Sequence, residues 1–229
     1  MNESYLCDCM EKMKEYPDKY FDLAVVDPPY GIGIQSMTFT KEGSRKKYGW
    51  SAAAKRDYDR TDAWDIKPTK DFFDELFRVS KKQVIWGFNH LCDMLPPTPS
   101  FICWDKRVND AMTNSFADCE LAWVSPGGGV GRIFRYCWNG MIQGDMANKE
   151  DRFHPTQKPI ALYAWIYQRY AKPGDKILDT HLGSGSSRCA AWDVGLDFVG
   201  MEINEFYYQK QEERFERHIA QLNMFNMGW

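Results

Sequence analysis

An acid, two prolines and an aromatic residue end a short apolar segment near the start of the chain. In this segment, LAVVDPPY, residues 23–26 predict a buried strand that runs directly into Asp27. Proline fixes its own φ and donates no backbone hydrogen bond, so Pro28 and Pro29 predict a stiff turn. Asp27 and Tyr30 are therefore expected to hold fixed positions at a strand end, where a carboxylate and a ring can act on a substrate. On these four residues alone, an ordinary rigid turn is the alternative.

A turn with two glycines lies in the C-terminal half, in the segment KILDTHLGSGSSRCAAWDVGLDFVGMEIN. A strand is expected to end at Asp179, Gly183 and Gly185 follow, and the next strand ends at Glu202, nineteen positions beyond Gly183. Glycines allow the backbone to approach a ligand closely, and an acid at the second strand end can bind both ribose hydroxyls. The third glycine of a dinucleotide fingerprint would fall on Arg188, which favours another adenosine compound over a nicotinamide cofactor. A helix-packing turn without a ligand is the alternative.

Alternating strands and helices must position these two turns, and the pattern predicts an α/β sheet. Strands are expected at 5–7, 23–26, 83–88, 176–179 and 198–201, and helices at 9–15, 71–80, 160–171, 185–194 and 205–221. Between residues 96 and 152 the pattern changes to short β-like runs, which predict antiparallel strands and loops added to the sheet. We therefore expect one domain over residues 1–229, with a doubly wound, mostly parallel sheet and an inserted β-rich recognition segment at 96–152.

Composition limits the protein class only broadly. A chain of 229 residues that is 44% apolar can bury one sizeable core. The net charge of −3 argues against a generally basic nucleic-acid-binding surface. No run of 18 apolar residues and no basic-then-apolar leader is present, so we expect a cytoplasmic protein without membrane contact. The seven cysteines form no C-x-x-C pair and the four histidines are scattered, so neither disulfides nor a metal site is predicted.

Four motifs together resemble the amino-methyltransferases that modify DNA bases. They are DPPY at 27–30, HPTQKP at 154–159, DTHLGSGSS at 179–187 and FVGMEIN at 198–204. Their order is similar to the beta class, a circularly permuted arrangement of the Rossmann-like methyltransferase fold. The strings DCMEKM, VIWGFNH, WDK and ADCELAWV also resemble this group, so that the resemblance spans nearly the whole chain. It implies that S-adenosylmethionine is the cofactor.

The resemblance also implies the reaction, which is methyl transfer to the exocyclic N6 amine of an adenine flipped out of DNA. This amine is a poor nucleophile because its lone pair is delocalised into the ring. Hydrogen bonds to the Asp27 carboxylate and the Pro28 carbonyl would free that lone pair, while Pro29 stiffens the turn and Tyr30 stacks on the base. An N4-cytosine enzyme more often carries serine in place of Asp27, which favours adenine. A methyltransferase acting on RNA and a non-catalytic DNA-binding module are further alternatives.

Cofactor contacts are carried over from the same resemblance. They are expected at Asp8, Asp27, Thr156, Lys158, Asp179, Gly183, Ser184, Gly185, Ser186, Glu202 and Asn204. Asp8 is similar to the acid that binds the adenine amine, although helix capping is a commoner use of such a residue. Thr156 and Lys158 resemble the segment that borders the methionine carboxylate. The sequence departs from the family at Thr180 and His181, where proline and phenylalanine are usual.

DNA contacts are expected in two regions. Residues 31–65 are predicted to form a mobile basic loop, since residues 41–60 carry seven Lys or Arg against three acids, a local charge of +4. The candidates for contact with DNA are Arg45, Lys46, Lys47, Arg56, Lys106, Arg107, Arg132 and Arg135. A solvated charged loop is the alternative for the first region. DNA is thus the predicted partner, and a homodimer stays open because relatives in this class often pair.

Overall fold

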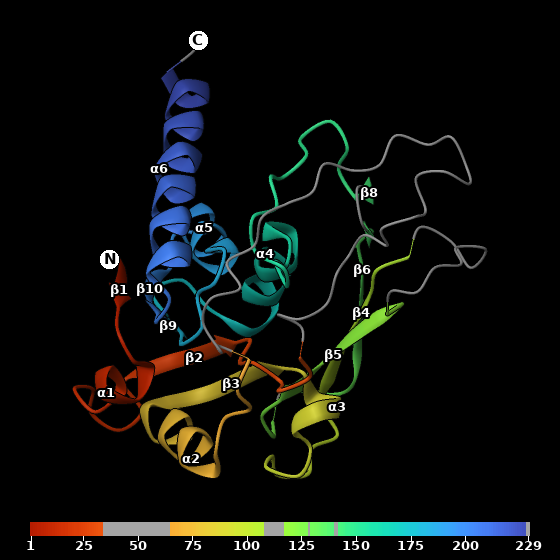
Figure 1. Ribbon diagram of the computed structural model, residues 1–229, viewed down its shortest axis with the longest axis vertical. Coiled ribbons are helices and arrows are strands. Elements are labelled where there is room, and N and C mark those ends of the chain that lie inside the picture. The colour runs from red at the N-terminus through yellow and green to blue at the C-terminus, as the bar shows by residue number, and fades with distance from the viewer. Residues whose placement is uncertain (34–64, 108–116, 128, 140–141, 228–229) are drawn as a thin grey trace.

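The computed structural model describes residues 1–33, 65–107, 117–127, 129–139 and 142–227, and all structural statements refer to these residues. An eight-stranded sheet in the order β1-β10-β9-β2-β3-β5-β4-β6 forms its centre (Figure 1). The strands are β1 (Asn2–Leu6), β2 (Phe21–Val26), β3 (Ser80–Trp86), β4 (Phe101–Asp105), β5 (Cys119–Val124), β6 (Arg132–Arg135), β9 (Lys176–Asp179) and β10 (Asp197–Glu202). A separate two-stranded hairpin pairs β7 (Trp138–Asn139) with β8 (Ile142–Gln143).

The middle of the sheet contains a point where the chain changes direction. The strands β1, β10, β9, β2 and β3 are all parallel, and β2 pairs with both β9 and β3. The chain proceeds outward from β9 to β10 on one side and from β2 to β3 on the other. In open α/β sheets, ligands bind at the carboxyl ends of the strands beside such a switch point. Asp27 follows β2 and Asp179 ends β9, so both acids lie at this position.

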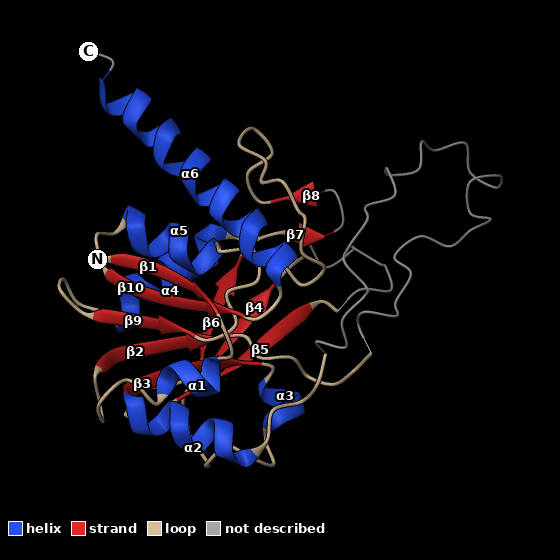
Figure 2. Cartoon of the chain, turned by 60° about the vertical axis from the view of Figure 1, so that its left-hand side comes forward, coloured by secondary structure: helices blue, strands red, loops and turns tan. Residues whose placement is uncertain are grey.

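Helices cover both faces of the sheet, as Figure 2 shows. One face packs against α1 (Cys9–Met13), α2 (Lys70–Val79) and α3 (Phe88–Leu91), and the other against α4 (Ile160–Tyr170), α5 (Ser186–Asp193) and α6 (Glu205–Met227). Strand β2 serves both cores, because Leu23 and Val25 join the core under α4, whereas Ala24 and Val26 join the core under α2. Successive strand side chains point to opposite faces, so a strand covered on both sides reads as an uninterrupted apolar run.

The segment from 96 to 152 extends the central sheet beyond β3. Strand β5 pairs antiparallel with both β3 and β4, as expected, but β6 pairs parallel with β4. The expectation of purely antiparallel pairing was therefore wrong for β6. Both edges of β5 are already occupied, so the chain that leaves β5 must cross to the free edge of β4. There the chain forms β6, which begins beside the start of β4 and therefore runs parallel to β4.

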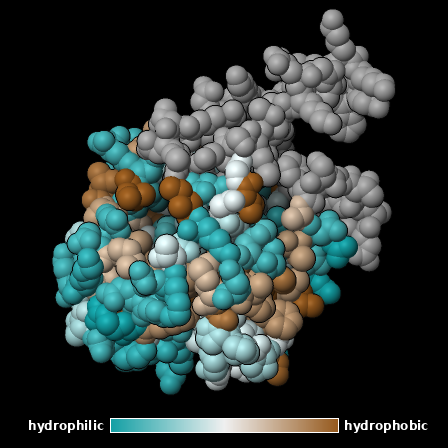
Figure 3. Space-filling view, turned by 60° about the horizontal axis from the view of Figure 1, so that its bottom comes forward, coloured by the Kyte–Doolittle hydropathy of each residue, from teal (hydrophilic) through white to brown (hydrophobic). Residues whose placement is uncertain are grey.

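The expected helices and strands otherwise appear near their predicted positions, and α6 continues to Met227 rather than ending at residue 221. The face seen in Figure 3 is mainly hydrophilic, with scattered apolar side chains. In the part of the chain that the structure describes, no helix is both long and apolar enough to cross a membrane.

Candidate active site

A pocket of about 810 Å³ that opens to solvent lies at the carboxyl ends of the parallel strands. It brings together the DPPY turn (residues 27–30), the glycine turn (residues 180–185) and the end of β10. The residues that line it are Asp27, Pro28, Pro29, Tyr30, Ile32, Asp65, His154, Thr156, Gln157, Lys158, Tyr163, His181, Leu182, Gly183, Ser184, Glu202, Ile203, Asn204 and Tyr207. The two turns singled out in the sequence therefore face one common cavity.

Asp27 accepts hydrogen bonds on both of its carboxylate oxygens. The Tyr30 hydroxyl donates to Oδ1 at 2.5 Å, and the Lys158 ammonium donates to Oδ2. Burial raises the pKa of Asp27, and the nearby Glu120 carboxylate adds to this rise, while Lys158 opposes it. Each carboxylate oxygen has two lone pairs, so both can still accept a bond from a ligand in the pocket.

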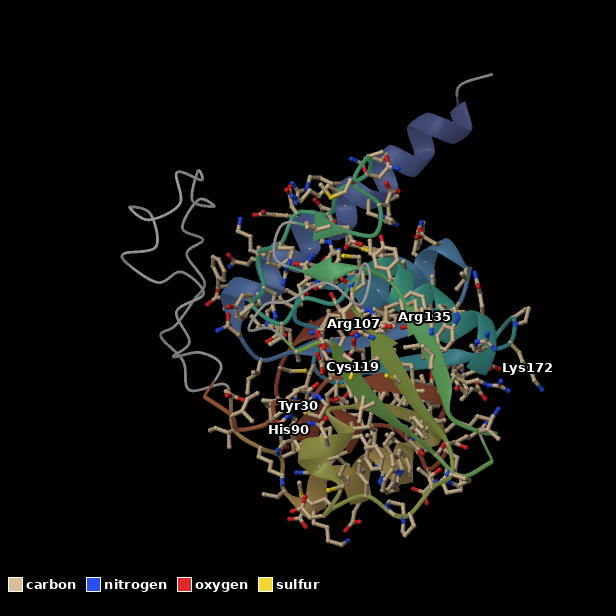
Figure 4. All side chains as sticks on the ribbon, turned by 90° about the vertical axis from the view of Figure 1, so that its right-hand side faces the viewer. Tyr30, His90, Arg107, Cys119, Arg135 and Lys172 are labelled. Carbon is tan, nitrogen blue, oxygen red and sulfur yellow. The ribbon has the colours of Figure 1, made fainter. Side chains whose placement is uncertain are left out.

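Tyr30 is fixed by close neighbours on β3 and α3. Its ring stacks on the His90 imidazole with centroids 5.1 Å apart and planes at 17°, and Figure 4 shows the two side chains next to each other. Gly87, which follows β3 and caps the start of α3, has a φ of +79°, and a Cβ there would lie 2.1 Å from Tyr30 Cε1. The ring therefore depends on a glycine at this position, both for space and for the backbone conformation.

Lys158 lies between two carboxylates. Its ammonium binds Asp27 and, at 3.2 Å, Glu120 Oε2, and the side chain is only 2% exposed. Burial alone would lower the pKa of Lys158, but the two carboxylates outweigh burial and raise it. Despite burial, Lys158 and Lys106 lower the pKa of Glu120 to about 2. The HPTQKP motif predicted instead that Lys158 lies beside the methionine carboxylate. No role was predicted for Glu120, although it is an acid within the apolar strand CELAWV.

Glu202, at the end of β10, is held by backbone groups. Gly183 N–H donates to Oε2 at 2.7 Å and Asn204 N–H donates to Oε1 at 2.9 Å. Burial raises the pKa of the Glu202 carboxyl. Gly183 has a φ of +51°, which favours glycine and exposes its N–H to the carboxylate. The expected ribose-binding acid and the expected glycine thus contact each other directly.

Asp179 supports the glycine turn but is not among the residues that line the pocket. The Ser187 hydroxyl donates to its Oδ2, and the His181 N–H donates to its Oδ1 at 3.1 Å. Burial raises the pKa of Asp179 to about 7. This carboxyl therefore connects the end of β9 to the first turn of α5, behind the cavity.

Three other expected cofactor residues also lie outside the pocket lining. Asp8 caps α1 and accepts a bond from Met10 N–H at 2.7 Å, which is the ordinary capping role. Gly185 ends the glycine turn and Ser186 begins α5, where the Arg214 guanidinium of α6 donates to Ser186 Oγ at 2.9 Å. Gly185 has a φ of +73°, and a Cβ there would come within 3.0 Å of α6. These residues shape the turn from its far side.

The candidates for DNA contact divide into two groups. Arg45, Lys46, Lys47 and Arg56 lie outside the described residues. Lys106, Arg107, Arg132 and Arg135 lie on or beside β4 and β6, and none of them lines the pocket. Arg107 pairs with Asp105 at 3.1 Å and Arg135 approaches the same carboxylate at 3.7 Å, and Figure 4 places the two arginines close together.

Several lining residues were not assigned a role from the sequence. His154 packs edge-on against Tyr207 with ring centroids 4.4 Å apart, and burial lowers the pKa of His154 to about 3, so its ring is neutral at pH 7. Asp65 accepts a bond from Gly31 N–H at 2.8 Å. The local signal for His154 was its place at the start of HPTQKP, a motif that also contains the lining residue Gln157. Among the described residues, no group of three or more His, Cys, Asp or Glu could hold a metal ion.

Comparison with known proteins gives three kinds of match. A protein-family model described as DNA methylase matches residues 100–213. YubD of Escherichia coli (strain K12), a protein that carries the name of a methylase, is 24% identical over 97% of this chain and 94% of its own length. Among solved structures, the complex of M1.HpyAVI with SAM has a TM-score of 0.57 at 18% identity, covering 93% of this chain and 100% of that chain.

The cytosine-N4-specific PvuII DNA methyltransferase is also similar, with a TM-score of 0.59 at 14% identity over 97% of this chain and 92% of that chain. The structural matches confirm the predicted α/β, Rossmann-like methyltransferase fold. The family model and YubD add a similarity in sequence to methylases.

Proposed function

We propose that this protein is a site-directed DNA methyltransferase that uses S-adenosylmethionine to methylate the N6 amine of a flipped adenine. The observation that carries the proposal is the convergence of the DPPY turn and the glycine turn on one pocket at the switch point of the sheet. A cofactor and a target base must meet at the reacting atoms, and this pocket offers a group of residues suited to each.

The pocket residues fit the cofactor in chemistry. The pocket opens to solvent, and its lining combines polar groups with aromatic and aliphatic side chains, as a nucleoside site requires. Each Glu202 oxygen accepts one backbone bond and has a further lone pair for a ribose hydroxyl. When bound, S-adenosylmethionine supplies an electrophilic methyl group on a sulfonium. Glu202, Asn204, Gly183 and Ser184 are the lining residues that would hold it.

The DPPY turn would bind the target amine. Asp27 and the Pro28 carbonyl accept its two hydrogens in hydrogen bonds, which draws the nitrogen toward tetrahedral geometry and makes its lone pair available. Tyr30 stacks on the flipped base and replaces part of the stacking that the base loses in leaving the duplex. Because the prolines stiffen the turn, the acceptors and the ring keep their relative positions, and catalysis depends on positioning more than on basicity.

Adenine is the preferred base, and cytosine is the second candidate. The acid Asp27 favours adenine, because N4-cytosine enzymes more often carry serine at the matching position. The likeness to the cytosine-N4-specific PvuII enzyme keeps the second candidate in view. Both bases present an exocyclic amine, and the same acceptor pair would serve either.

The chain order favours the circularly permuted beta class, since β2 with its DPPY turn precedes β9 in sequence although the two strands are adjacent in the sheet. We assign target recognition to the segment 96–152, whose arginines Arg132 and Arg135 lie on the edge strand β6. Arginine binds phosphate and guanine through paired donors, which suits a DNA-facing edge.

The test is to incubate purified protein with labelled S-adenosylmethionine and unmethylated genomic DNA, digest the DNA and identify methylated nucleosides by mass. We expect N6-methyladenine from the wild type and none from Asp27→Ala. Detection of N4-methylcytosine instead would support the same mechanism with cytosine as the target base. A parallel reaction with RNA shows which of the two nucleic acids is methylated faster. Tight cofactor binding without any product on DNA or RNA would contradict the proposed activity.

A further inference from the structure

A line of alternating charges leads from β4 to the DPPY turn. Lys106 binds Glu120 Oε1 at 3.0 Å, and Lys158 bridges Glu120 Oε2 and Asp27 Oδ2. The side chain of Lys158 is 2% exposed, so two carboxylates replace the water that an ammonium normally binds. A buried charge stays stable only when such partners surround it, and this one has a partner on each side.

Two tryptophans support this line of charges from one side. The Lys158 ammonium lies 5.3 Å from the ring centroid of Trp86, and the Lys106 ammonium lies 5.7 Å from that of Trp104. The two indoles pack edge to face with centroids 6.2 Å apart, and both are almost fully buried. Ring faces attract cations, so the indoles help to fix both ammonium groups.

On the basis of the proposed function, we infer that Glu120 and Lys158 are positioning residues for Asp27. Glu120 holds the Lys158 ammonium against Oδ2 of Asp27. The ammonium in turn keeps Asp27 ionised and oriented to accept a hydrogen bond from the target amine. A protonated carboxyl would donate a proton where the amine needs an acceptor. The Tyr30 hydroxyl fixes the other oxygen, Oδ1. In this assignment, Lys158 affects the target amine through Asp27. In the role carried over from the sequence, Lys158 would instead bind the methionine carboxylate of the cofactor.

The charges around Asp27 predict the direction of a pH effect. The described titratable groups that face it are Tyr30 of the same turn, Lys158 before α4, Tyr163 of α4, Glu120 of β5 and Asp179 of β9. Burial and the two other acids favour the protonated form of Asp27, while the Lys158 ammonium favours the ionised form. Removing the ammonium therefore raises the pKa of Asp27, and the carboxylate is recovered only at higher pH.

The first experiment measures this ionisation without any reaction. Carbon-13 NMR of aspartate carboxyls follows the titration of wild type, Lys158→Met, Glu120→Gln and the double variant Lys158→Met/Glu120→Gln, and Asp27→Asn assigns the signal. We expect the Asp27 titration to move upward by about one pH unit or more in Lys158→Met. The double variant removes one buried acid as well, so it provides a folded comparison if the single variant is unstable. An Asp27 titration that does not move upward from wild type to Lys158→Met, or from Glu120→Gln to the double variant, overturns the inference.

The second experiment separates the target from the cofactor. We expect Lys158→Met to lower kcat about 10- to 100-fold at pH 7, with recovery toward pH 9 and an S-adenosylmethionine Kd within about threefold of wild type. Lys158→Arg should restore part of the rate. Glu120→Gln should lower kcat because Lys158 loses the carboxylate that holds it against Oδ2. This loss should not recover at high pH, because the substitution also removes a charge that opposes Asp27 ionisation.

Lys210→Met serves as the matched control, since Lys210 forms an exposed pair with Glu213 on α6 and should leave kcat unchanged. Loss of cofactor affinity in Lys158→Met, with the saturated rate and its pH profile unchanged, overturns the inference and returns Lys158 to the methionine carboxylate. If the wild type transfers no methyl group, the proposed function fails, and the NMR titration alone decides the role of Lys158.

Discussion

Asp27 directly follows the parallel strand β2 and Glu202 ends the parallel strand β10, and both line one pocket, yet the protein holds them by different means. Side chains hold Asp27, namely the Tyr30 hydroxyl and the Lys158 ammonium. Backbone amides hold Glu202, including that of Gly183 in the glycine turn. A carboxylate held by the backbone keeps its place as long as the turns fold, whereas one held by ionisable side chains responds to substitution and pH. Substitution of Asp27 should therefore mainly reduce methyl transfer, whereas substitution of Glu202 should mainly weaken cofactor binding.

The largest effect should come from Asp27→Ala. Loss of the acceptor should reduce methyl transfer by about 10³-fold or more, because the target amine then has no carboxylate to draw out its lone pair. Cofactor binding should change little, since Glu202 and the glycine turn are untouched. Single-turnover transfer and calorimetric titration with S-adenosylmethionine measure the two effects. Asp18→Ala is the control, because that carboxylate is 76% exposed. Equal loss of transfer and binding would remove the contrast between the two acids.

Glu202→Gln should have the opposite effect. The amide turns one acceptor oxygen into a donor that faces a backbone N–H, so the ribose site loses both charge and order. We expect the cofactor Kd to rise by about 10- to 100-fold, or about 1.4 to 3 kcal/mol, with the rate at saturating cofactor nearly unchanged. Calorimetry and saturation kinetics provide the measurement. An unaltered Kd would show that the backbone-held acid does not bind the cofactor.

Asp179, between these two acids, should affect stability. Its pKa is raised to about 7 in the folded protein, so the native state binds more protons than the unfolded state between about pH 4 and 7. The free energy of unfolding should therefore fall as pH rises through this range, by about 1 to 4 kcal/mol in total. Asp179→Asn should flatten this dependence. Urea denaturation of the cofactor-free protein from pH 4.5 to 8 tests it, and identical slopes for both proteins would contradict it.

Tyr30→Phe should produce the smallest change. It removes the hydrogen bond to Asp27 Oδ1 but keeps the ring that stacks on His90. Because Lys158 still orients the carboxylate, we expect a loss of about two- to tenfold in the rate of transfer. Tyr30→Ala, which also removes the ring, should lose considerably more. If Tyr30→Phe were as inactive as Asp27→Ala, the hydroxyl would have a direct part in the reaction.

Much of the fold could be predicted from the sequence, because the relevant signals are local. The apolar run 23–26 is continuous because β2 is covered on both faces, and a buried parallel strand needs no polar positions. The glycine turn was recognisable because positive φ values at Gly183 and Gly185 require that residue type. The strands of 96–152 were also recognised, but the parallel pairing of β6 with β4 was not, since periodicity does not encode strand order.

The candidate site was predictable only in part. Asp27, Tyr30, Gly183 and Glu202 all line the pocket, because each sits at a strand end or turn that the local sequence marks. Asp8 was harder to place, since one acid before a helix can either cap it or reach a ligand, and here it caps α1.

By itself, the sequence determined the two turns and the acids that they present, because prolines, glycines and apolar runs act on their immediate neighbours. Only the tertiary structure decided how those acids are held. Residues 27, 120 and 158 belong to β2, β5 and the loop before α4, and they meet because of the strand order and the packing of α4 on the sheet. Electrostatic pairing acts through space and depends on burial, so no local sequence pattern predicts it.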